Sequence, residues 1–366
     1  MRYVRMPIEQ ESPEEYGYDL IRFNLSESSV SDRTFAGLGL KLPDITLLYG
    51  EHRGSREMRE LIAAEGDGLV PYDVLMTAGA AGALFIIATA LLDKDDHLIV
   101  VRPNYATNIE TPRAIGCAIS YHDLAFEDGF ALDVERLAAA ITPRTKLISV
   151  TCPHNPTGTA LSLEDLKALI ALAEAAGCRL LVDETYRDLS YAPPLPLAAS
   201  LSPSAISVSS LSKAYGVPGI RMGWLITRDP ELQEVFLAAK EQISICGSAI
   251  DEWVGLQVMR RKGEMLAQTL PEMRRRLALV SDWIATEPLL EWVAPTGGVV
   301  CFPRMKAEPA GGMAAFYDRL LRDHGAYVGP GHWFEMSDRH FRLGYGWPTA
   351  EELEGGLKAI SAALRG

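Results

Sequence analysis

The segment from Ser210 to Trp224 contains a lysine placed for covalent chemistry. Lys213 follows a short run of apolar and small residues, and Arg221 stands eight residues after it. A lysine amine attacks a carbonyl carbon only when it is partly neutral, and burial beside a second cation lowers its pKa toward that state. The hydroxyl of Ser210 and the guanidinium of Arg221 are groups that bind a phosphate dianion. The segment therefore predicts a Schiff-base lysine beside a phosphate site, with a surface turn and an exposed lysine as the alternative.

Two further segments place polar side chains at the ends of expected strands. Residues 153–158 read Pro-His-Asn-Pro-Thr-Gly and follow the apolar run 147–151, although this composition alone is that of an ordinary turn. Asp183 ends the apolar run 179–182 and precedes Tyr186. Ligands of open α/β sheets bind at the carboxyl ends of strands, so Asp183 lies where a functional carboxylate is expected. The alternative role for a single acid at this place is that of a helix N-cap.

The elements that must position these residues alternate along the middle of the chain. Runs rich in β-branched residues are typical of buried strands, and between them apolar residues recur at helical spacing. This alternation predicts an α/β fold with a mainly parallel sheet wrapped by helices. The expected strands are 98–101, 146–150, 179–182, 205–209 and 223–227, and the expected helices are 79–92, 163–176 and 230–243.

The chain changes character after residue 265. A helix at 271–286 leads to the segment 297–302, and a helix at 313–323, a strand at 340–343 and a final helix at 349–364 follow. We expect a large domain over residues 46–265 and a smaller α+β domain over residues 266–366. Residues 1–45 have weak periodicity, and we expect this N-terminal segment to pack with the small domain.

The composition argues against several classes of function. The 35 Lys and Arg residues against 48 Asp and Glu residues give a net charge of −13, which repels phosphate backbones and argues against a nucleic-acid partner. The five cysteines form no C-x-x-C pair, and none of the seven His residues has metal-ligand spacing, so we expect no disulfides and no metal. The first residues lack the apolar core of a signal peptide, and the most apolar helical stretch, 84–92, is much shorter than the ~20 residues that span a bilayer. We expect a soluble, cytoplasmic protein without a membrane partner.

Together the three segments resemble the fold-type I pyridoxal-phosphate aminotransferases of class I and II, the aspartate and histidinol-phosphate aminotransferase group. The shared features are an Asn-Pro-x-Gly turn at 155–158, Asp-x-x-Tyr at 183–186 and Ser-x-x-Lys-x7-Arg at 210–221. The resemblance extends over nearly the whole chain, and it implies an aspartate-aminotransferase-like large domain that binds pyridoxal 5'-phosphate (PLP) on a sheet of the seven-stranded type. Further matches are Tyr49-x4-Gly54, Thr77-x-Gly79, Pro330-Gly331 and Arg342-Leu343.

The resemblance also implies roles around the cofactor ring. Lys213 would hold PLP as an internal aldimine and then move the proton between the substrate Cα and the cofactor. Asp183 would pair with the pyridine nitrogen and keep it protonated, because the protonated ring is the electron sink of this chemistry. Asn155 and Tyr186 match residues that form hydrogen bonds with the ring 3-oxygen, and Tyr105 matches the aromatic residue that stacks on the ring face.

For the phosphate group, the resemblance implies contacts from Ser210, Arg221 and the backbone N–H groups of Ala80 and Ala81 at a helix start. That start reads Gly-Ala-Ala-Gly, so it supplies no hydroxyl where relatives often have Ser or Thr. Cofactor binding then depends more on the other contacts. Tyr49 matches a tyrosine that reaches the phosphate of the other subunit, which implies a homodimer with shared active sites.

For the substrate, Arg342 matches the arginine that binds the α-carboxylate, and Asn155 and Ser26 are the other expected contacts. The segment 24–28 is expected to line the side-chain pocket, where Glu27 or the nearby Tyr16 and Tyr18 favour a basic or polar substrate. The reaction that the resemblance implies is transfer of an amino group from an L-amino acid to a 2-oxo acid.

Two alternatives to transamination are open. Lyases, cyclases, synthases and deaminating oxidases of the same fold use the same cofactor residues, because the orientation of the bonds about Cα decides which of them breaks. The other alternative is a regulatory module that has lost catalysis. Such modules usually carry a DNA-binding domain ahead of this fold, whereas here the resemblance begins near residue 20.

Overall fold

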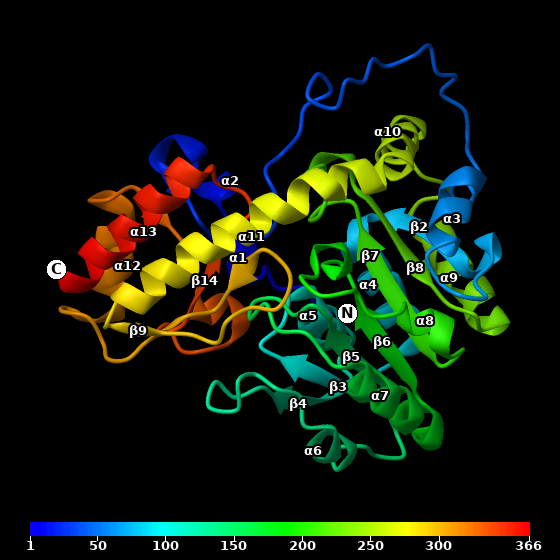
Figure 1. Ribbon diagram of the computed structural model, residues 1–366. Coiled ribbons are helices and arrows are strands. Elements are labelled where there is room, and N and C mark those ends of the chain that lie inside the picture. Colours follow the sequence, from blue (N-terminus) through cyan, green and yellow to red (C-terminus); the bar gives the residue numbers. More distant parts are fainter.

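A computed structural model describes residues 1–366 (Figure 1). At its centre lies a seven-stranded sheet in the order β2-β8-β7-β6-β5-β3-β4. Neighbouring strands are parallel except at β8, which runs antiparallel to β2 and to β7. The structure therefore confirms an α/β fold built on a mainly parallel sheet. The strands are β2 (Val74–Ala78), β3 (His97–Arg102), β4 (Ala118–Asp123), β5 (Thr145–Thr151), β6 (Arg179–Asp183), β7 (Ala205–Ser210) and β8 (Met222–Ile226).

The two edge strands of this sheet, β2 and β4, lie outside the strands expected from the sequence. Most residues of β4 are only half-buried. Its sequence Ala-Ile-Ser-Tyr-His-Asp mixes polar and apolar side chains without a clear pattern, so the strand could not be recognised from its sequence. β2 is short and apolar and passes directly into the next helix. Both strands are recognised by their pairing rather than by their own sequence.

Helices cover both faces of the sheet (Figure 1). Alternate side chains of each strand point to opposite faces. In β5, Ile148 and Val150 lie in one apolar cluster with Leu169 of α7, whereas Leu147 lies in a second cluster with Phe236 of α9. The helices of this part are α3 (Arg56–Ala63), α4 (Gly79–Leu91), α5 (Thr107–Ile115), α6 (Val134–Ala138), α7 (Leu163–Ala176), α8 (Ala198–Leu201), α9 (Pro230–Ile243) and α10 (Ala249–Arg260).

The long helix α11 (Lys262–Thr286) leads from the sheet to the rest of the molecule (Figure 1). It begins earlier than the expected start at Pro271. Proline is typical of the first turn of a helix, but here Pro271 lies inside α11. Beyond α11, β14 pairs antiparallel with both β10 and β13, and β9 pairs with β11. The elements are β9 (Leu290–Glu291), β10 (Val300–Cys301), β11 (Arg304–Met305), α12 (Gly312–Arg322), β12 (Ala326–Tyr327), β13 (Gly329–Pro330), η5 (Gly331–Phe334), β14 (Phe341–Gly344) and α13 (Ala350–Arg365).

The N-terminal segment packs against this C-terminal part. It contains α1 (Pro7–Gln10), α2 (Pro13–Tyr16) and β1 (Phe23–Asn24), and β1 pairs in parallel with β12. The ring of His332 lies between two carboxylates, with Nδ1 2.8 Å from Asp338 Oδ1 and Nε2 2.8 Å from Glu11 Oε2. These contacts support our proposal that residues 1–45 pack with the small domain. No helix combines the length and the apolar character needed to cross a membrane.

Candidate active site

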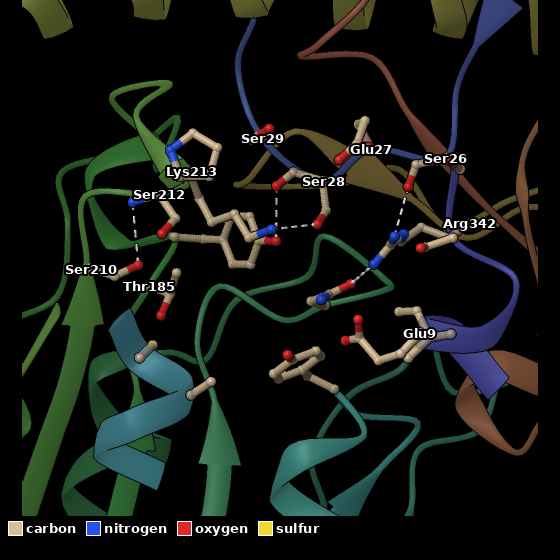
Figure 2. Close-up of a pocket in the computed structure, with 18 of the residues that line it drawn as sticks. Glu9, Ser26, Glu27, Ser28, Ser29, Thr185, Ser210, Ser212, Lys213 and Arg342 are labelled. Carbon is tan, nitrogen blue, oxygen red and sulfur yellow. Dashed lines mark hydrogen bonds between the residues drawn. The ribbon is translucent and has the colours of Figure 1, made fainter. Parts of the chain in front are cut away.

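A cavity of about 380 Å³ opens beside the carboxyl ends of the parallel strands, between the sheet and the N-terminal segment. Figure 2 shows how side chains from distant parts of the sequence converge on it. Every site residue expected from the sequence lines this cavity except Tyr49, whose side chain lies elsewhere and is exposed. The expected residues that line it are Ser26, Ala80, Ala81, Tyr105, Asn155, Asp183, Tyr186, Ser210, Lys213, Arg221 and Arg342.

Lys213 lies in the turn between β7 and β8, and its side chain reaches into the cavity. Its amine donates a hydrogen bond to Ser28 Oγ at 3.0 Å (Figure 2). Desolvation lowers the pKa of Lys213; the carboxylate of Glu27 opposes this shift, and the guanidinium of Arg342 adds to it. The exposed-lysine alternative is therefore wrong, and the amine is held in surroundings that favour its neutral form.

Asp183 is the last residue of β6 and is buried. Its Oδ1 accepts hydrogen bonds from the hydroxyl of Thr185 at 2.6 Å and from the Thr185 N–H at 3.1 Å. Desolvation raises the pKa of Asp183, and the two Thr185 bonds oppose that rise. Both bonds fall on the same oxygen, which fixes the carboxylate so that it faces the cavity without neutralising it.

One end of the cavity suits an anion. Ala80 and Ala81 lie in the first turn of α4, and Ser210 and Arg221 lie beside it. The packing here is so close that a Cβ at Gly223 would lie 2.6 Å from the backbone nitrogen of Ala80. Helix-terminal N–H groups, a hydroxyl and a guanidinium form a donor set for a phosphate dianion.

Arg342, on β14, is buried at another part of the cavity. Its guanidinium donates to the Ser26 carbonyl oxygen at 2.6 Å and to Asn155 Oδ1 at 3.3 Å. Its Nε is buried and has no hydrogen-bond partner. A buried guanidinium with an unused donor suits an anionic ligand, and a carboxylate matches it in shape and charge.

Tyr186 and Tyr105 complete the walls of the cavity. The Tyr186 hydroxyl donates to the Ser28 carbonyl oxygen at 2.9 Å, and burial raises its pKa to about 12. Burial also raises the pKa of Tyr105. Both phenols therefore stay protonated in the neutral pH range and act as hydrogen-bond donors or as aromatic surface.

The chain matches the family model of the class I and II aminotransferases over residues 42–360. This chain belongs to the class I and II aminotransferase family. It is 31% identical over 361 residues to capreomycidine synthase of Streptomyces vinaceus, covering 95% of this chain and 91% of that protein. It is 32% identical to an arginine–pyruvate transaminase of Pseudomonas aeruginosa over 316 residues, covering 81% of this chain and 77% of that one.

Solved structures agree with this assignment. A PLP-dependent aminotransferase from Streptococcus suis superimposes with a TM-score of 0.91 at 28% identity and covers 100% of this chain and 98% of its own. The PLP-dependent cyclase OrfR superimposes with a TM-score of 0.88, also at 28% identity, over 100% and 98% of the two chains. The chain is therefore an enzyme of the PLP-dependent aminotransferase family, and its cofactor is pyridoxal phosphate.

The cavity of this family member fits that cofactor. The fit rests on the donor set at the start of α4, on an amine of lowered pKa at Lys213 and on a buried carboxylate at Asp183. The donor set matches the phosphate of the cofactor, the Lys213 amine matches its aldehyde, and the Asp183 carboxylate matches its protonated ring nitrogen. The residues present therefore suit the whole cofactor.

Some lining residues were not found from the sequence. Thr185 follows Asp183 by two positions, and a hydroxyl at that spacing from an aspartate is a turn signal that could have been read. Ser28 was expected to line the side-chain pocket as part of the segment 24–28, but its hydrogen bond with Lys213 was not expected, because nothing in the sequence marks that contact. The carboxylates of Glu9, Glu14 and Asp32 also line the cavity, because the N-terminal segment folds back over it.

Proposed function

We propose that this enzyme is an aminotransferase that moves an amino group from an L-amino acid to a 2-oxo acid. The observation that carries the proposal is that Lys213 and Arg342 line one cavity. An amino-acid substrate needs two groups in the site. An amine removes the proton from its α-carbon, and a guanidinium binds its α-carboxylate.

Five side chains are proposed to hold the cofactor ring. Lys213 binds it covalently, and Asp183 accepts a hydrogen bond from the ring nitrogen. Asn155 and Tyr186 contact the 3-oxygen, and Tyr105 covers one face. When bound, PLP supplies the electron sink that makes the substrate Cα–H acidic. The rigid hydrogen bonds of Thr185 to Asp183 support this assignment, because they hold the carboxylate ready in one orientation.

Phosphate binding is assigned to the start of α4 and its surroundings. The N–H groups of Ala80 and Ala81, the Ser210 hydroxyl and the Arg221 guanidinium are the proposed donors. Arg221 has φ 49° and donates to the Pro218 carbonyl oxygen at 2.9 Å, so its side chain is oriented before any ligand binds. Preorganised donors of this kind bind an anion with little loss of conformational freedom.

Lys213 and Arg342 act on the substrate in this proposal. Arg342 binds the α-carboxylate, with Asn155 and the Ser26 region beside it, and so orients the Cα–H bond toward the cofactor. Lys213 would take the proton from Cα and deliver it to the cofactor carbon, which keeps the amino group when the 2-oxo acid is released. Its lowered pKa suits both steps, because a general base works best when its pKa is close to the working pH.

We also propose a homodimer with shared active sites. The loop before α3 runs away from the body of the molecule (Figure 1), and Leu47, Leu48 and Tyr49 are 76%, 63% and 77% exposed. Consecutive exposed apolar side chains are typical of an interface. Tyr49 would then reach the phosphate site of the partner. A cytoplasmic location is proposed because all five cysteines are free, as in a reducing compartment.

The test of transamination is direct. Purified protein is loaded with PLP and mixed with one amino acid and one 2-oxo acid from a panel, and the new amino acid and new 2-oxo acid are measured by mass spectrometry. We expect both products in equal amounts from the wild type and none from Lys213→Arg, which keeps the charge. Absence of amino-group exchange across the panel contradicts the proposal.

A second candidate is a cyclase or another PLP-dependent reaction at Cα or Cβ, such as elimination or oxidative deamination. It is favoured by the similarity to capreomycidine synthase and to the cyclase OrfR. In that case the amino acid is consumed although no 2-oxo acid is added, and the product is a cyclic, elimination or oxidation product. The same mass spectrometry distinguishes the two candidates, because only transamination requires a 2-oxo acid and converts it into a new amino acid.

A further inference from the structure

We propose that the acidic recess formed by Glu9, Glu14, Glu27 and Asp32 binds the cationic side chain of the substrate, so that the enzyme acts on basic amino acids. This inference rests on the proposed function, because it concerns the same cavity. All four residues line that cavity and belong to the N-terminal segment. In Figure 2, Glu27 and Glu9 appear on either side of Arg342 in the view shown.

A charge balance of the cavity leads to this proposal. Its lining contains three cations, Lys213, Arg221 and Arg342. The proposed function uses each of them, for the aldehyde, the phosphate and the α-carboxylate of the ligands. Among the lining carboxylates it uses only Asp183, for the ring nitrogen. The recess therefore contributes four negative charges that neither the cofactor nor the substrate backbone balances.

These four carboxylates have no cationic partner within the chain. No Lys, Arg or His nitrogen lies within 4.0 Å of any of them. Their polar partners are the indole N–H of Trp347, which donates to Asp32 at 2.9 Å, and the hydroxyl of Tyr18 beside Glu14. Desolvation raises the pKa of Glu27; Lys213 and Arg342 oppose this rise, whereas Glu14 and Asp32 add to it. An ammonium or guanidinium group among them would relieve this repulsion.

The position of Arg342 determines how an amino-acid substrate is oriented in the cavity. Its buried Nε lacks a partner, which calls for a carboxylate at that point of the cavity. An amino acid held there by its carboxylate and at Cα near Lys213 has only its side chain left to occupy the recess. Glu27 stands between Ser26, which accepts a hydrogen bond from Arg342, and Ser28, which accepts one from Lys213, so it should contribute most to selection.

L-Arginine and L-citrulline make a matched pair of probes. They have nearly the same shape, but arginine ends in a cation and citrulline in a neutral urea. The PLP-loaded enzyme is titrated with each, and the change in the absorbance of the bound cofactor gives a rate and an apparent affinity whatever the final product is. We expect kcat/KM for arginine to exceed that for citrulline at least about tenfold, because a partly buried ionic hydrogen bond is worth that much.

Variants locate the selection. Glu27→Gln should lower the ratio of kcat/KM for arginine to kcat/KM for citrulline about tenfold. The ratio is the measure because the Glu27 carboxylate also raises the pKa of Lys213, and an effect on the amine is common to both substrates. Glu9→Gln, at an exposed position of α1, should change the selectivity for arginine in the same direction but by less. This variant tests the recess if Glu27→Gln does not bind PLP. Asp19→Asn is the matched control, because Asp19 belongs to the same segment and is exposed but does not line the cavity.

The outcomes separate the two proposals. If citrulline or small neutral amino acids react as well as arginine, or if Glu27→Gln affects both probes equally, the inference about the recess is wrong and the proposed function stands. Equal reaction is also the result expected if a cation of a partner subunit fills the recess. If the enzyme binds PLP but no amino acid changes its absorbance, the proposed function fails and the inference fails with it.

Discussion

The amine of Lys213 and the hydroxyl of Ser28 are joined by a hydrogen bond of 3.0 Å. The carbonyl oxygen of the same Ser28 accepts the Tyr186 hydroxyl at 2.9 Å. One residue of the N-terminal segment thus touches two side chains that the proposed function places on the cofactor. Ser28 is buried, so this link is only partly open to solvent at the cavity wall.

Replacement of Ser28 by Ala should slow the reaction more than it weakens substrate binding. Without the hydroxyl, the Lys213 amine loses the acceptor that orients it during proton transfer, and we expect kcat to fall about tenfold with KM within about threefold. Stopped-flow kinetics on the PLP-loaded enzyme measure both. Ser29→Ala is the control, because the hydroxyl of Ser29 also lines the cavity but forms no hydrogen bond. Equal effects of the two variants would exclude a positioning role for Ser28.

Gly223→Ala should disturb the phosphate end. The added Cβ would lie 2.4 Å from the carbonyl carbon of Gly79 and 2.6 Å from the backbone nitrogen of Ala80, so the start of α4 must shift. We expect a loss of about 1–3 kcal/mol in the free energy of unfolding and a PLP dissociation constant raised at least about tenfold. Thermal denaturation and fluorescence titration measure these changes.

Gly219→Ala provides the comparison for Gly223→Ala. A Cβ at Gly219 meets no atom within 4 Å, so its effect on the free energy of unfolding should stay within about 0.5 kcal/mol. PLP affinity should be unchanged. If both variants bind PLP like the wild type, the close packing at Gly223 does not matter for the cofactor.

How much of this site was accessible from the sequence depends on how each residue is positioned. Asp183 ends β6 and Lys213 follows β7, two strands that were predicted from the sequence. Their common location at the carboxyl edge of the parallel sheet could therefore be predicted. Ser28 and Glu9 could not be placed in the same way. They reach the cavity only because β1 pairs with β12, a long-range contact that leaves no local pattern.

The fold shows the same division. The central strands of the sheet are buried on both faces and therefore have continuous apolar sequences, which is why they were predicted. β4 at the edge has a mixed sequence, and α11 begins before Pro271 because packing outweighs the local signal of that proline. The role of Tyr49 stays a prediction, since the side chain is 77% exposed in the single chain.

The His332 contact should make stability depend on pH. Hydrogen bonds to Asp338 and Glu11 raise the pKa of His332 from 6.5 to about 9. Because the folded-state pKa is the higher one, this stabilisation is complete below pH 6.5 and is lost as the pH rises through about 9. The melting temperature of His332→Gln should therefore lie below that of the wild type at pH 6, and the difference should shrink at pH 9.5.

His324→Gln is the control for this pH dependence, because His324 forms no ion pair in the structure. Its melting temperature should follow that of the wild type at both pH values. If the difference between His332→Gln and the wild type does not change with pH, the charge of the imidazolium does not hold the N-terminal segment in place.

Leu47→Asp should weaken self-association. Leu47 is 76% exposed in the single chain, and a carboxylate at the centre of an apolar interface costs far more than one in water. Analytical ultracentrifugation should show a shift from dimer to monomer at micromolar protein, together with weaker PLP binding if Tyr49 serves the partner. Leu163→Asp is the control, because an acid is favourable in the exposed first turn of α7. A monomeric wild type would contradict the proposed dimer.

The parallel pairing of β1 with β12 has a consequence for how the protein is made. Phe23 and Asn24 leave the ribosome early, but their partners Ala326 and Tyr327 come near the end of synthesis. The central sheet can close while the chain is still growing, since all of its strands precede residue 227. The substrate side of the cavity, by contrast, can form only after release of the nearly complete chain. A nascent enzyme would thus acquire its cofactor-binding surface before it acquires its choice of substrate.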